Sequence, residues 1–125
     1  MMSKATILIV EDNEMNMDIA SRLLEREGYC ILKAVNGGMA IELVQKKKPH
    51  LVLMDMQMPE IDGFAVTKIL KENQDTRTIP IVAFTAFAMD DDRKNALGCG
   101  CIGVITKPID VSSFAQTVKS FLPPF

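Results

Sequence analysis

Short apolar runs alternate with longer amphipathic stretches along the whole chain. The first run, residues 5–10, has no polar residue on alternate positions, which is the pattern of a strand buried on both faces. The other predicted strands cover residues 30–35, 51–54, 81–84 and 103–106. The intervening stretches space apolar residues as one face of a helix does, and they predict helices over residues 14–27, 38–47, 64–73, 89–97 and 111–122. This alternation predicts an α/β fold with a parallel sheet covered by helices on both faces.

Residues that start and stop helices support these boundaries. Asn13 and Asp110 precede the first and last helices and suit the N-cap position, and Gly28 suits the end of the first helix. The acidic residues 90–92 suit the positive end of the fourth helix dipole. The apolar positions expected on the inner faces of the third and last helices are Val66, Ile69, Leu70, Phe114, Val118 and Phe121.

Composition narrows the class of protein. A length of 125 residues suits one domain, which we place over the whole chain, and 48% hydrophobic residues allow a substantial core. The net charge of −2 argues against direct binding of nucleic acid. We expect a cytoplasmic protein with no membrane insertion, because there is no leader and no apolar run of about 18 residues. Three cysteines give no disulfide framework, and Cys99 and Cys101 are interpreted as small buried thiols.

Polar residues stand where the predicted strands end. They are Glu11, Asp12, Asp55, Thr85 and Lys107. The carboxyl ends of parallel strands form the rim where open α/β sheets bind ligands, so we expect these side chains to lie together. Each alone has a structural interpretation: Asp12 as a helix cap, Thr85 as a strand residue and Lys107 as a surface lysine. Their shared position on one rim favours a site.

The residue types limit the chemistry of such a site. Crowded carboxylates repel one another and raise each other's pKa unless a cation neutralises them. Carboxylate oxygens without a neighbouring His or Cys favour Mg²⁺ over zinc or copper. A carboxylate nucleophile flanked by Mg²⁺ and an ammonium group suits phosphoryl transfer, and the hydroxyl of Thr85 could donate to a phosphoryl oxygen.

The same residues resemble the response-regulator receiver family. The resemblance rests on Glu11-Asp12-Asn13 after a strand, the stretch 53–59 around Asp55, Asp62-Gly63, Thr85-Ala86 and Lys107-Pro108. These motifs follow the family's order and spacing over the whole chain. The resemblance implies a flavodoxin-like (CheY-like) doubly wound sheet with strand order 2-1-3-4-5 and five helices.

The resemblance also implies a role for each residue. Asp55 would accept a phosphoryl group from a phosphohistidine on a sensor histidine kinase or a histidine phosphotransfer protein. Mg²⁺, or Mn²⁺ in its place, would be bound by Asp12, Asp55 and the backbone carbonyl of Gln57, and by Glu11 largely through water. Lys107 would pair with Asp55 and then with the phosphoryl group, and Thr85 would be the switch hydroxyl. The bond before Pro108 would be cis.

The expected output is a change in protein–protein interaction. With no output domain in 125 residues, the chain is similar to stand-alone receivers, which report to a downstream protein target; we expect a monomer or weak dimer. It would catalyse only its own phosphorylation and slow dephosphorylation. The expected interaction face includes Phe87, Met89 and Val104. Val104 replaces the family's usual Tyr or Phe, so the aromatic switch would be missing, and Phe87 with Gln57 would shield a long-lived aspartyl phosphate.

Three rival interpretations remain. The first two are less compatible with these residues, and the third concerns only whether the chain is part of a longer protein. A phosphatase of the haloacid-dehalogenase class needs a second Asp two residues after its nucleophile, where this chain has Gln57. A flavin-binding module needs small or hydroxyl residues after the first strand, where Glu11 and Asp12 would repel a phosphate. A receiver cut from a longer hybrid kinase would carry the same motifs.

Overall fold

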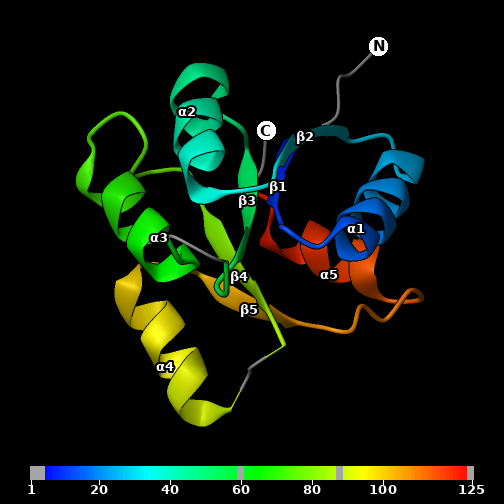
Figure 1. Ribbon diagram of the computed structural model, residues 1–125. Coiled ribbons are helices and arrows are strands. Elements are labelled where there is room, and N and C mark those ends of the chain that lie inside the picture. The colour runs from blue at the N-terminus through cyan, green and yellow to red at the C-terminus, as the bar shows by residue number, and fades with distance from the viewer. Residues whose placement is uncertain (1–4, 59–60, 87–88, 124–125) are drawn as a thin grey trace.

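The computed structural model describes residues 5–58, 61–86 and 89–123. A five-stranded parallel sheet has the order β2-β1-β3-β4-β5, with a helix after every strand (Figure 1), so the predicted fold and strand order are confirmed. The strands are β1 Thr6–Val10, β2 Cys30–Ala34, β3 Leu51–Asp55, β4 Ile81–Thr85 and β5 Gly103–Thr106. The helices are α1 Glu14–Arg26, α2 Gly37–Lys47, α3 Gly63–Glu72, α4 Asp90–Cys99 and α5 Phe114–Phe121. Among the described helices, none has the length and apolar content needed to cross a membrane.

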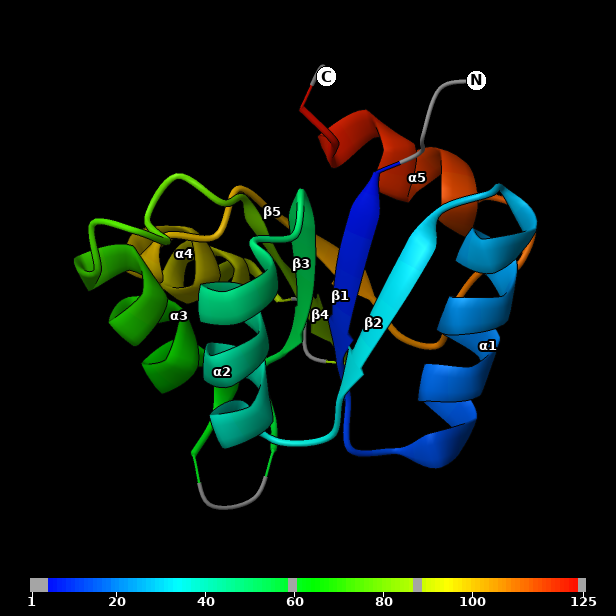
Figure 2. The same cartoon turned by 90° about the horizontal axis from the view of Figure 1, so that it is seen from above.

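The helices form two layers on opposite faces of the sheet. Helices α1 and α5 cover one face, and α2, α3 and α4 cover the other (Figure 2). Each layer has its own core. Ile9, Leu24 and Phe84 belong to the core under α1 and α5, and Val10 and Met54 belong to the core under the other three helices. Strands β3 and β4 are buried along their whole length, as a parallel sheet covered on both faces requires.

The sheet register brings the strand ends together at one rim. Val10 of β1 pairs with Met54 of β3, and Asp55 pairs with Phe84 of β4. Thr85 pairs with Thr106 of β5. The residues that follow β1 and β5 therefore lie at the same edge as the last residues of β3 and β4.

Helix boundaries agree with the predicted ones to within one or two residues except at α5. The Asn13 side chain accepts a hydrogen bond from the Asn16 N–H at 2.9 Å, which confirms it as the N-cap of α1. Gly28 follows α1 with a φ of 94°, a left-handed conformation that glycine adopts without strain. The predicted start of the last helix at residue 111 is wrong, because Asp110 accepts from the N–H and hydroxyl of Ser112 and residues 111–113 form a turn.

The predicted inner face of α3 is partly wrong. Val66 and Leu70 are buried as expected, but Ile69 is 40% exposed while Thr67 is fully buried. Thr67 takes the inner position because it lies one residue after Val66 and three before Leu70, on the stripe that faces the sheet. For α5, the predicted inner residues Phe114 and Val118 are buried as expected.

Candidate functional site

The predicted rim residues do lie together at the carboxyl ends of the strands. Glu11, Asp55 and Thr85 are almost fully buried, with exposed fractions of 1%, 2% and 5%. The Lys107 side chain is 11% exposed, and Asp12 is exposed to solvent. A buried carboxylate is costly unless it is paired with a charge or held by hydrogen bonds, so the surroundings of Glu11 and Asp55 decide what the site can do.

Three carboxylates form the centre of the site. One oxygen from each of Glu11, Asp12 and Asp55 lies within 4.8 Å of the others. Glu11 Oε2 accepts from the Asn13 N–H at 3.1 Å, and Asp55 Oδ1 accepts from the Gln57 N–H at 2.9 Å. These backbone donors hold one oxygen of each buried carboxylate.

Lys107 supplies the cation of the site. Its Nζ atom lies 2.8 Å from Glu11 Oε1 and 3.4 Å from Asp55 Oδ2. The ammonium therefore pairs with Asp55, as the resemblance implied, and lies closer still to Glu11. The backbone N–H of Lys107 donates to the Thr85 carbonyl at 2.8 Å. The Lys107–Pro108 bond is cis, as the resemblance implied.

The side chain of Lys107 also lies over an aromatic ring. Its Nζ atom is 5.0 Å from the centre of the Phe84 ring, close enough for a cation–π contact. The sequence indicated Phe84 only as a buried strand residue, because no local signal marks a ring that lies under a lysine distant in sequence.

The surroundings of Asp55 raise its pKa. Burial is the main cause that raises its pKa from 3.8 to about 7; Glu11 also raises it, and the Gln57 N–H and Lys107 lower it. In the absence of a further cation, burial therefore disfavours the charged form of this carboxylate.

The donor set fits a magnesium ion. Three carboxylates and one ammonium leave a formal charge of −2, which a divalent cation balances. The donors are hard oxygens with no His or Cys among them, as Mg²⁺ prefers. When bound, such an ion supplies a positive charge that a transferring phosphoryl group and its nucleophile can share.

Close packing positions the loop after β3. A Cβ atom on Gly63 would lie 2.7 Å from Met56 Cα and would also collide with the Asp55 carbonyl oxygen. Only glycine allows the start of α3 to approach the strand end this closely. Asp62 caps α3 by accepting from the Ala65 N–H at 2.9 Å. The Asp62-Gly63 pair therefore fixes the backbone behind Asp55.

The remaining predicted residues lie around this centre. Thr85 and the exposed Gln57 line one small cavity of about 30 Å³, enough for about one water molecule. Met89 is the N-cap of α4 and is 78% exposed, so its side chain is not part of the core. Val104 is half-buried in β5. Phe87 lies outside the described residues.

Comparison with known proteins identifies the class. The response regulator receiver domain family matches residues 7–119, so the chain belongs to this family of two-component signalling domains. Receiver domains bind Mg²⁺ in an acidic cleft and are phosphorylated signalling proteins rather than classical enzymes.

Individual relatives show which members of the family the chain resembles. The chain is 44% identical over 117 residues to the polar-differentiation response regulator DivK of Brucella anthropi, covering 94% of this chain and 95% of that protein. The DivK protein of Brucella ovis matches with the same identity and coverage. The chain is thus a DivK-like receiver with a role in phosphorelay signalling.

Solved structures agree with the fold. Chemotaxis protein CheY4 of Vibrio cholerae superposes with a TM-score of 0.90 at 23% identity, covering 96% of this chain and 100% of that one. The receiver domain of a sensor histidine kinase from Pseudomonas aeruginosa, solved with a magnesium ion coordinated in its active-site cleft, has a TM-score of 0.86 and 28% identity, covering 95% and 98%.

Proposed function

We propose that Asp55 accepts a phosphoryl group from a phosphohistidine of a sensor histidine kinase or a histidine phosphotransfer protein. The observation that carries this proposal is a buried carboxylate at the end of β3, with Lys107 Nζ 3.4 Å from its Oδ2 atom. One oxygen each of Glu11 and Asp12 lies within 4.8 Å of an oxygen of this carboxylate. Family membership and the DivK-like relatives support the proposal.

The geometry suggests how the residues would divide the work. The Gln57 N–H holds Asp55 Oδ1, which leaves Oδ2 beside Lys107 as the attacking oxygen. As the new oxygen–phosphorus bond forms, the nitrogen–phosphorus bond of the phosphohistidine breaks and its electron pair returns to the imidazole. Lys107 would then move from Glu11 toward the phosphoryl oxygens, because their charge is greater. Thr85 would donate its hydroxyl to one of them.

Asp12, Asp55 and the backbone carbonyl of Gln57 would hold Mg²⁺, or Mn²⁺ in its place, with Glu11 contributing largely through water. The ion would neutralise charge on the entering phosphoryl group. The exposure of Asp12 suits a ligand that meets a partly hydrated ion, since Mg²⁺ usually keeps several waters.

We further propose that the chain acts as a single receiver domain in the cytoplasm, as a monomer or weak dimer. It would catalyse only its own phosphorylation and slow dephosphorylation, and it would signal by phosphorylation-dependent binding to a downstream protein. The expected contact face is formed by α4, β5 and α5. The 78% exposure of Met89 at the start of α4 supports this, because an exposed methionine is available to a partner.

The test is phosphorylation by acetyl phosphate, followed by mass spectrometry of the intact chain. One phosphoryl group should be added in the presence of Mg²⁺, and none in EDTA or in Asp55→Asn. Asp75→Asn is the matched control, because Asp75 is an exposed acid in the loop after α3 and is not part of the acidic cluster. Labelling that persists undiminished in Asp55→Asn would defeat the assignment.

A further inference from the structure

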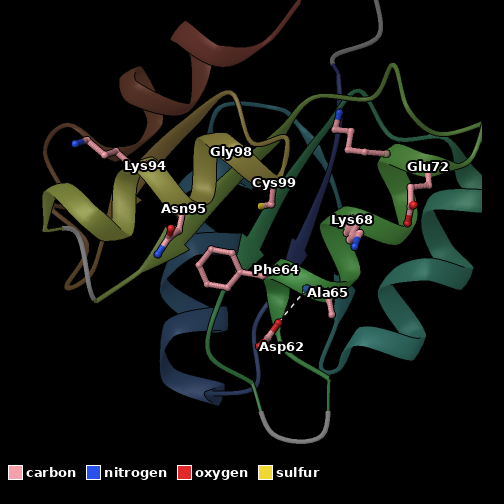
Figure 3. Close-up of a pocket in the computed structure, with 10 residues that line it drawn as sticks. Asp62, Phe64, Ala65, Lys68, Glu72, Lys94, Asn95, Gly98 and Cys99 are labelled. Carbon is pink, nitrogen blue, oxygen red and sulfur yellow. Dashed lines mark hydrogen bonds between the residues drawn. The ribbon is translucent and has the colours of Figure 1, made fainter.

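A groove between α3 and α4 adjoins the rim site, since Phe64 lines both the groove and the small cavity beside Thr85 and Gln57. Its volume is about 780 Å³, in the range of small-molecule pockets, and none of the carboxylates of the acidic cluster lines it. Figure 3 shows the Phe64 ring extending from α3 toward α4, with Asn95 and Cys99 of α4 around it. The groove therefore has an aromatic wall, an amide and a thiol at its centre.

The charged groups of the groove are available to a ligand to different degrees. Lys71 is occupied, because its ammonium donates to the carbonyls of Arg77 at 3.0 Å and Ile79 at 2.7 Å. Within the described residues, the ammonium groups of Lys68 and of Lys94, both of which line the groove, make no hydrogen bond or ion pair. Glu72 lies at the other end of α3 from Phe64. Asp62 also lines the groove, beside Phe64, and its Oδ1 atom accepts from the Ala65 N–H. The lining therefore carries three lysines against two carboxylates, a net charge of +1, and the ammonium groups of Lys68 and Lys94 are the ones that can attract an anion.

Gly98 is the least explained residue of α4. It lies inside the helix, where glycine costs about 1 kcal/mol relative to alanine. It has no left-handed φ, and a Cβ atom at this position would meet nothing within 4 Å. Close contacts explain Gly37, Gly63 and Gly103, and a left-handed φ explains Gly100. What Gly98 does achieve is to keep the α4 wall of the groove open.

We infer that this groove binds a small aromatic anion, with its ring against Phe64 and its carboxylate or phosphate toward Lys68. The apolar surface offers one ring face, a thiol and the methyl group of Ala65. That is enough for one planar ring. A partner helix would need a row of apolar pockets spaced along the groove.

The experiment is a backbone-amide NMR titration of the full chain with naphthoate, which carries a planar ring and a carboxylate. Naphthalene methanol is the neutral probe of the same shape. The variants are Lys68→Gln and Gly98→Leu, and Lys47→Gln on α2 is the matched lysine control. No phosphorylation is involved, so the outcome is independent of the role proposed for Asp55.

Naphthoate should give saturable shifts centred on Phe64, Asn95 and Cys99. Lys68→Gln should weaken binding about threefold, the usual worth of one exposed charge pair, and the neutral probe should bind more weakly by a similar factor. Gly98→Leu should fill the groove and abolish the shifts, while thermal unfolding shows that the variant is folded; Gly98→Ala should weaken them partially. Shifts centred elsewhere, equal binding of the neutral probe, or full binding by Gly98→Leu would overturn the inference.

Discussion

Replacing Asp55 with asparagine should stabilise the metal-free protein above neutral pH. The side chain is 2% exposed, and burial beside Glu11 raises its pKa from 3.8 to about 7. A raised folded-state pKa means that the folded protein binds this proton more tightly than the unfolded chain does. The stabilisation from the neutral form is complete below the unfolded pKa of 3.8 and is lost as pH rises through about 7. Asparagine keeps the shape and stays neutral throughout.

The magnitude follows from the size of the shift. The folded and unfolded pKa values of Asp55 differ by about 3 units. At about pH 8 this difference makes the parent about 4 kcal/mol less stable to unfolding than Asp55→Asn, since each unit is worth about 1.4 kcal/mol. At about pH 5 the folded-state carboxyl is protonated and only about 1.5 kcal/mol remains. The advantage of Asp55→Asn should therefore shrink by about 2 to 3 kcal/mol between these two pH values.

Urea unfolding in EDTA measures this difference directly, with Asp75→Asn as the exposed control. The difference in free energy of unfolding between Asp55→Asn and the parent should change with pH, while that of the control should stay near zero. At about pH 8, Mg²⁺ at about 100 times its Kd should reduce the advantage of Asp55→Asn, because such a ligand adds about 2.7 kcal/mol to the parent and asparagine removes a ligand oxygen. A pH-independent difference would refute the reasoning about burial.

Four further predictions follow from particular residues. In the metal-free protein, Lys107→Ala should lower the free energy of unfolding in urea by about 3 kcal/mol, because it leaves the buried Glu11 carboxylate without its cation. The same variant should weaken the response of a partner to phosphorylation. Lys47→Ala is the control and should do neither. Gly63→Ala should cost about 2 kcal/mol in thermal unfolding by overpacking against Met56. Phe87→Glu should speed loss of phosphate from Asp55, measured by intact mass, and equal or slower decay would contradict shielding. A beryllofluoride phosphoryl mimic should shift backbone NMR signals mainly at the start of α4, since Val104 has no ring to rotate; large shifts confined to β5 would contradict this.

The sequence by itself determined the elements and the membership of the site. Strand and helix periodicities are local, so the runs of residues 81–85 and 103–106 could be recognised without knowing their neighbours. The rim residues could be grouped because parallel strands must end at the same edge. Asn13 was recognisable as a cap because its partner, the Asn16 N–H, is three residues away.

Tertiary structure decided what depends on contacts between distant residues. Glu11 and Lys107 are 96 residues apart, and which carboxylate the ammonium approaches depends on where the sheet, with β3 and β4 in between, places the ends of β1 and β5. The pKa of Asp55 depends on burial by the whole site, which no local pattern encodes. The same holds for the groove beside Gly98, since an empty space between two helices exists only after both have packed on the sheet.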